Sequence, residues 1–106
     1  MRTVDHKVKE AVETGGNYRT GNTKVETIAG VTTVHLFGNR IFHFDRNTNT
    51  ATLDTCGWDS QTTVARLNGC LMGVGAGFGL KLLKKHTVIA GGAKENRRIS
   101  HKVWRV

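Results

Sequence analysis

The chain has 106 residues, a length that suits one domain. Its 38% hydrophobic and 23% charged residues exclude a wholly disordered chain. Apolar runs fall short of the roughly 20 residues that a membrane-spanning helix needs. The first ten residues alternate charges without the apolar stretch of a signal peptide, so a cytoplasmic protein is expected.

The positive charge is concentrated towards the C-terminus. The net charge is +8, and residues 1–75 carry eight Lys and Arg against seven Asp and Glu. Residues 76–106 carry eight Lys and Arg against Glu95 alone. This asymmetry indicates an anionic partner such as a nucleotide, a nucleic acid or an acidic protein, although a solvated basic face explains many such segments.

The first half of the chain predicts a short helix followed by strands. Apolar residues at helical spacing predict a helix over residues 4–13, and the Thr-Gly-Gly-Asn sequence at 14–17 ends it. Residues 23–29, 31–37, 40–46 and 50–55 are rich in Thr, Val, Ile and Phe, which favours an antiparallel meander. The absence of proline leaves its turns to Gly, Asn and Asp.

Gly38-Asn39 predicts the loop of the second hairpin. In that register one face carries Val34, Leu36, Ile41 and His43, and the other carries His35, Phe37, Phe42 and Phe44. Both faces are then partly apolar. We therefore expect a helix on one face and a second subunit on the other, which predicts a homodimer or a higher homo-oligomer.

The second half predicts one main helix over residues 60–73, with Val64, Leu67, Leu71 and Val74 forming its apolar stripe. Glycine at every second position from 73 to 79 breaks the helix. Residues 80–90 allow a helix but favour a strand, and residues 99–106 predict a closing edge strand. The expected fold is α+β, one domain over 1–106, with a four- to five-stranded antiparallel meander packed with the main helix and the short N-terminal helix.

The start of the main helix carries the densest cluster of polar chemistry. Hydroxyl groups at a helix N-terminus favour anions, an arginine holds phosphate through two hydrogen bonds, and an indole stacks on bases. The arginine is expected on the face of the two threonines. The predicted ligand-binding residues are Trp58, Ser60, Thr62, Thr63, Arg66 and Asn68.

The same residues have a structural interpretation. Ser60 and its neighbours can be ordinary helix caps, and Trp58 can belong to the core. Arg66 can pair with Asp54 or Asp59, and Asp59 itself disfavours an anion at this terminus unless its carboxylate turns aside.

The chain resembles small proteins of tailed phages that carry a Val-x-Leu-x-Gly-Asn hairpin followed by Gly-Trp-x-x-x-Thr-Thr-x-Arg-x-Asn. The resemblance covers about residues 31–90 and implies a phage protein, acting in the infected bacterial host, with a compact α+β fold. It implies no activity, and Phe37 stands where that pattern has His. The matching residues are Val34, Leu36, Gly38, Asn39, Gly57, Trp58, Thr62, Thr63, Arg66 and Asn68.

Other patterns are weak. Cys56 and Cys70 are expected to be free thiols, and the five scattered histidines lack metal-ligand spacing, so neither a metal nor a cofactor is expected.

The alternating glycines lack the Lys-Ser/Thr of a phosphate-binding loop. A ribonuclease would need an acid–base pair such as His35 and His43, which the expected register places on opposite faces. A protein without enzymatic activity is therefore expected.

Three binding hypotheses remain. The first is a phosphate-bearing ligand held by the helix cluster, most specifically a nucleotide signal of host defence that the protein sequesters. The second is RNA or DNA bound by a basic C-terminal third. The third is inhibition of an acidic host protein. The residues predicted for the basic patch are Lys81, Lys84, Lys85, Arg97, Arg98, Lys102 and Arg105.

Overall fold

The fold is that of a computed structural model, which describes residues 2–92 and 94–99, and the backbone of 104 and 105. Helix α1 spans Thr3–Thr14, and five strands follow it: β1 (Tyr18–Arg19), β2 (Thr23–Ile28), β3 (Val31–Leu36), β4 (Asn39–Asp45) and β5 (Thr50–Leu53). Helix α2 then spans Gln61–Gly73. The chain continues through β6 (Gly79–Leu83), β7 (His86–Ala90) and β8 (Trp104–Arg105).

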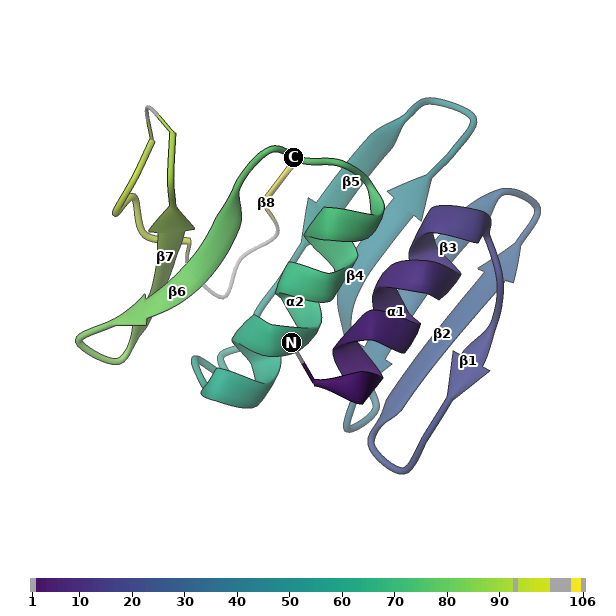
Figure 1. The fold of residues 1–106 in the computed structure, drawn as a ribbon, viewed down its shortest axis with the longest axis horizontal. Coiled ribbons are helices and arrows are strands. Elements are labelled where there is room, and N and C mark those ends of the chain that lie inside the picture. Colours follow the sequence, from purple (N-terminus) through teal and green to yellow (C-terminus); the bar gives the residue numbers. More distant parts are fainter. Residues whose placement is uncertain (1, 93, 100–103, 106) are drawn as a thin grey trace.

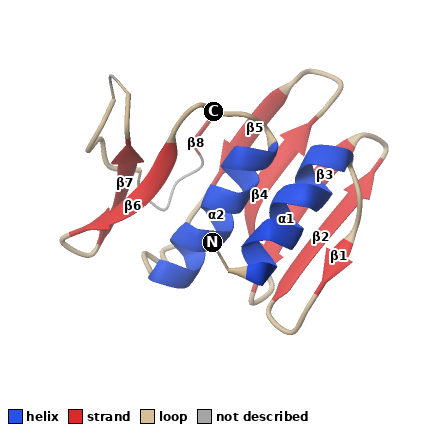
Figure 2. Cartoon of the chain, viewed as in Figure 1, coloured by secondary structure: helices blue, strands red, loops and turns tan. Residues whose placement is uncertain are grey.

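The described strands form one large antiparallel sheet and one hairpin. The large sheet has the order β1-β2-β3-β4-β5-β8, and β6 pairs only with β7. Both helices lie on the same face of the large sheet, and the β6–β7 hairpin stands beside α2 (Figure 1). Figure 2 shows the same separation of helix and strand layers. The predicted α+β class is confirmed, with the short strand β1 added to the expected meander.

Both predicted helices are confirmed. Helix α1 buries Val8, Ala11 and Val12 and ends at Gly15, whose φ of 74° is the left-handed conformation that glycine adopts without strain. Helix α2 begins after Ser60, and its stripe of Val64, Leu67 and Leu71 is buried. These apolar side chains pack in one hydrophobic core with Val25, Val34, Phe42 and Leu53 of the sheet.

The two helices approach closely because glycine lines the contact on α2. A Cβ at Gly69 would lie 2.8 Å from the Asp5 carbonyl oxygen, and one at Gly73 would lie 2.9 Å from that of Lys9. The alternating glycines therefore have two separate roles. Gly73 admits the backbone of α1, whereas Gly75 and Gly77 have positive φ in the loop after α2.

The expected register of the second hairpin is wrong. Leu36 pairs with Asn39, so the two-residue loop is Phe37-Gly38, and a bulge on β4 follows because His35 pairs with Arg40 while Val34 pairs with Phe42. Gly38 therefore takes the second loop position, where φ of 81° suits glycine. The side chains of Phe42 and Phe44, assigned to the face of His35, point instead to the helices.

The correction leaves the face of the sheet opposite the helices mostly polar, with the pair Ile28 and Val31 as its apolar part. His35 and Arg40 are partners on this open face, and so are Thr33 and His43. In the described part of the chain, no helix packs on it (Figure 1). The expected second apolar face is therefore wrong, and the homo-oligomer stays a prediction without that support.

The expectation of one strand over residues 80–90 is also wrong. Leu83 pairs with His86, and Lys84-Lys85 forms a two-residue turn between β6 and β7. The sequence did not predict this turn, because residues 84 and 85 are lysines and not the Gly or Asn that such turns favour. The closing edge strand is confirmed in part, since β8 pairs with β5 at Trp104 and Arg105.

Candidate functional site

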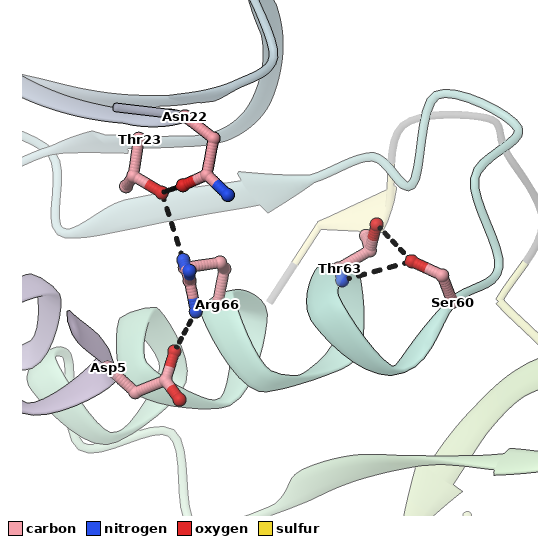
Figure 3. A network of polar contacts seen from close by, with 6 residues as sticks. All are labelled: Asp5, Asn22, Thr23, Ser60, Thr63 and Arg66. Carbon is pink, nitrogen blue, oxygen red and sulfur yellow. Dashed lines mark hydrogen bonds and ion pairs between the residues drawn. The ribbon is translucent and has the colours of Figure 1, made fainter. Parts of the chain in front are cut away.

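Arg66 lies in the interior and not on the helix surface. Its Nη1 donates to Asp5 Oδ1 at 2.7 Å and its Nε to Thr23 Oγ1 at 2.9 Å (Figure 3). The arginine and aspartate side chains are 5% and 2% exposed. The predicted placement of the Arg66 guanidinium at the surface beside Thr62 is therefore wrong, because an internal carboxylate already holds it.

The partner is Asp5, which was not among the acids considered from sequence. A signal for it existed, since Asp5, Val8 and Val12 follow the i, i+3, i+7 spacing of one helix face. An acid on the buried face of α1 requires a buried cation. Three of the side chains in Figure 3, those of Asp5, Arg66 and Thr23, thus join α1, α2 and β2.

The hydroxyl groups of Ser60 and Thr63 at the start of α2 are used within the fold. Ser60 Oγ accepts from the Thr63 backbone N–H at 3.2 Å and lies 3.1 Å from Thr63 Oγ1 (Figure 3). Thr63 is buried and Thr62 half-buried. Asp59 turns aside, accepting from the backbone N–H and the hydroxyl of Thr87 at 3.2 and 2.6 Å. The helix start therefore serves as an ordinary cap, and it anchors β7.

Asn68 holds β6 against α2. Its amide Nδ2 donates to the Leu80 carbonyl at 3.0 Å, and its Oδ1 accepts from the Leu80 N–H at 2.7 Å. The predicted ligand contact is thus an internal contact that satisfies both backbone groups of one residue.

Replacing Asn68 by alanine is expected to lower the free energy of unfolding by about 2–4 kcal/mol, because two polar groups of Leu80 lose their partner. Chemical denaturation measures this change, and hydrogen exchange should show β6 opening first. Asn68→Asp is the matched comparison, since it keeps one acceptor but loses the donor. Equal stability of wild type and Asn68→Ala would contradict the stabilising role of the two hydrogen bonds between Asn68 and Leu80.

Trp58 is the predicted site residue that remains open to solvent. Its 64% exposure excludes the core interpretation. Trp58 shares a small cleft with Phe37, which is 70% exposed, and with Leu36 and Ser60 at one end of the sheet. From sequence, Phe37 was assigned to a sheet face and singled out only as the residue that stands where the phage pattern has His.

A larger depression of about 380 Å³ lies at the same end of the sheet. It is lined by Arg19, Lys24, His35 and Phe37, together with the turn between β1 and β2. Lys24 also lies 3.5 Å from Glu26. Sequence reasoning missed this site because β1 is two residues long and carries no strand periodicity.

His35 and His43 lie on the same face of the sheet, contrary to expectation. Each points away from the helices, because the bulge on β4 changes which residues face the core. The register thus no longer separates the two imidazoles. They nevertheless line different hollows, His35 beside Lys24 and His43 beside Arg40.

The basic residues of the C-terminal third gather on the hairpin beside α2. The basic arm comprises residues 79–92 and 94–98, in which Val88 and Arg98 form a further bridge. Glu95 is its single described carboxylate and lies 3.9 Å from Lys81. The exposed cations are Lys84, Lys85, Lys94, Arg97 and Arg98. Of the predicted patch, Lys102 lies outside the described residues, and only the backbone of Arg105 is described.

Both cysteines are free, as predicted, with Cys70 buried and Cys56 half-buried. Burial raises the pKa of the Cys70 thiol. Burial, aided by Asp54, also raises the pKa of Cys56 despite the opposing charge of Arg40. Both thiols are therefore protonated at neutral pH and are poor nucleophiles.

Within the described residues, no cluster of three His, Cys, Asp or Glu side chains is placed to hold a metal ion. The described helices are also too short or too polar to cross a membrane.

The fold and its surface define a small α+β protein that carries a basic hairpin arm. Residues 1–103 match the family described as Kyanoviridae Gp96 protein, so the chain belongs to this family of phage proteins. The resemblance to phage proteins is confirmed at this level. Neither the curated proteins nor the solved structures contain a match to the chain.

Proposed function

We propose that this phage protein binds nucleic acid through the basic arm and does not transform it. The observation that supports the proposal most is charge: the arm carries six Lys and Arg against Glu95 alone. Five of those cations are exposed, and Lys81 is the only one within 4.0 Å of a described carboxylate. Lysine and arginine side chains that neutralise phosphates release counterions, which supplies most of the affinity for nucleic acid.

The turn of the arm adds a second line of support. Lys84 and Lys85 have φ values of 50° and 67°, in a turn whose positions suit Asn and Gly. A non-glycine residue in this conformation costs about 1 kcal/mol. Two lysines therefore occupy strained positions at the tip, and a phosphate contact there gives a reason for them.

The more specific hypothesis, sequestration of a host-defence nucleotide, depended on Arg66 as the phosphate ligand. The ion pair with Asp5 withdraws that support. Inhibition of an acidic host protein would use the same charges as nucleic acid does. Direct binding of an oligonucleotide to the purified protein separates these two functions.

The double variant Lys84→Asn, Lys85→Gly tests the arm. Its affinity for a fluorescein-labelled 20-nucleotide RNA should fall about tenfold at 100 mM salt, because two counterion-releasing contacts are lost. The slope of log affinity against log salt should become shallower by about 1.4 for single strands or 1.8 for duplexes. The melting temperature should rise, since Asn-Gly relieves the turn. Fluorescence anisotropy and thermal melting measure these changes.

The matched control is Arg2→Gln, Lys7→Gln, which removes the same charge from exposed positions on or beside α1. It should keep most of the affinity. An equal loss in both variants would indicate a general charge effect and would contradict binding by the arm. The RNA should also remain intact after incubation, whereas cleavage products would contradict binding without catalysis.

A further inference from the structure

The depression at the end of the large sheet is built by two turns that hold each other. The Phe37 backbone N–H donates to the Asn22 carbonyl at 2.8 Å, which ties the β3–β4 turn to the β1–β2 turn. Lys24 and His35 are register partners on the neighbouring strands β2 and β3, and both line the depression. A depression of about 380 Å³ is within the usual range of small-ligand sites, which begins near 300 Å³.

Phe37 is held in a conformation that its side chain does not favour. Its φ is 51°, and a bulky residue with positive φ is an outlier that requires compensation. Packing of the ring does not compensate for this strain, because Phe37 is 70% exposed. Strain of this kind, with no packing benefit, is typical of residues kept for binding.

The rest of the lining is polar and basic. Arg19 is exposed, and Lys24 keeps donors free beyond its 3.5 Å approach to Glu26. His35 Nδ1 is buried and has no hydrogen-bond partner among the described residues. An aromatic ring, two cations and an unsatisfied imidazole nitrogen therefore border one hollow.

We propose that this depression binds a nucleotide, with the base stacked on Phe37 and the phosphate held by Arg19 and Lys24. His35 Nδ1 then gains a polar partner on the ligand. Stacking is suited to the exposed ring because every base has a π-face, and the two cations supply the complementary charge. The site does not include residues of the basic arm. Nucleotide binding in the depression can therefore be tested independently of nucleic-acid binding by the arm.

Trp58 distinguishes the source of the nucleotide. It shares a cleft with Phe37 on the side towards α2, outside the depression itself. A free mononucleotide in the depression does not need Trp58. A strand that continues past Phe37 places its next base within reach of the indole.

The test is Phe37→Asn, which creates an Asn-Gly turn. The variant should bind AMP and a ten-nucleotide adenosine RNA roughly tenfold more weakly, through the lost stacking. It should at the same time melt at a higher temperature, because Asn suits the left-handed position. Isothermal titration calorimetry for AMP, fluorescence anisotropy for the RNA and thermal melting give these readouts.

The matched control is Ala29→Asn, because the Ala29-Gly30 turn has φ values of 52° and 82°, nearly those of Phe37-Gly38. It should give a similar stabilisation and no change in binding. Arg19→Gln should weaken AMP but leave adenosine unchanged. Trp58→Ala should weaken the RNA alone if the nucleotide comes from a strand, and neither ligand if it is free.

Unchanged AMP affinity in Phe37→Asn would overturn the proposal, and so would the absence of AMP binding by the wild-type protein at millimolar concentration. The arm variant Lys84→Asn, Lys85→Gly should bind AMP as the wild type does. Failure of the arm proposal and failure of this one therefore give different results.

Discussion

Replacing Asp5 by alanine is expected to lower the free energy of unfolding by about 3–5 kcal/mol, the usual cost of removing one partner from a buried ion pair. The Arg66 guanidinium would keep its place under the sheet, with Thr23 as its remaining polar contact. Its positive charge would then be buried without compensation. Urea denaturation followed by circular dichroism measures the loss.

Two comparisons identify the cause of this loss. Glu10→Ala removes an exposed carboxylate from the same helix and should change stability by no more than about 0.5 kcal/mol. Replacing both partners, as Asp5→Leu with Arg66→Met, should recover much of the stability, because apolar pairs replace buried ion pairs well. If Asp5→Ala is as stable as the wild type, the buried ion pair between Asp5 and Arg66 is contradicted. Arg66 would then again be a candidate phosphate ligand at the surface.

Replacing Gly69 by alanine is expected to destabilise the protein by about 1–3 kcal/mol, the usual cost of overpacking. Alanine normally gains about 1 kcal/mol over glycine within a helix. Here the new methyl group would lie 2.8 Å from the Asp5 carbonyl oxygen. That oxygen belongs to the backbone of α1, so relief requires the helices to separate, and separation would lengthen the bond between Asp5 and Arg66.

Gly21→Ala is the control, because no atom lies within 4 Å of the new methyl group there. It should leave stability unchanged or slightly raised, since alanine reduces the freedom of the unfolded chain. A gain in stability for Gly69→Ala would show that α1 moves away at little cost and would contradict a close helix crossing.

Local patterns predicted the elements that depend on local chemistry. The 3.6-residue spacing of Val64, Leu67 and Leu71 identified α2, and the β-branched runs identified the central strands. The prediction of which side chains face the core failed at the second hairpin, where the position of the turn sets the register. Moving the loop from Gly38-Asn39 to Phe37-Gly38 and adding a bulge changed the faces of Phe42 and His43, because side chains alternate along a strand.

The strained turns at Phe37 and at Lys84-Lys85 are also where local rules are broken. In each, a residue suited to contacting a ligand stands where Asn would favour the turn. Natural sequences break such rules most often at functional positions. This is why both proposals are tested by substitutions that should stabilise the fold while weakening binding.

The α+β class, the two helices and the concentration of positive charge towards the C-terminus follow from the sequence, because each depends on neighbouring residues or on composition. Which charges are available to a partner depends instead on how distant segments pack together. Arg66 and Asp5 are 61 positions apart, and their contact depends on how α1 packs against α2. Burial of that pair removed the arginine from the predicted site, while Phe37 and the basic arm remained exposed to solvent.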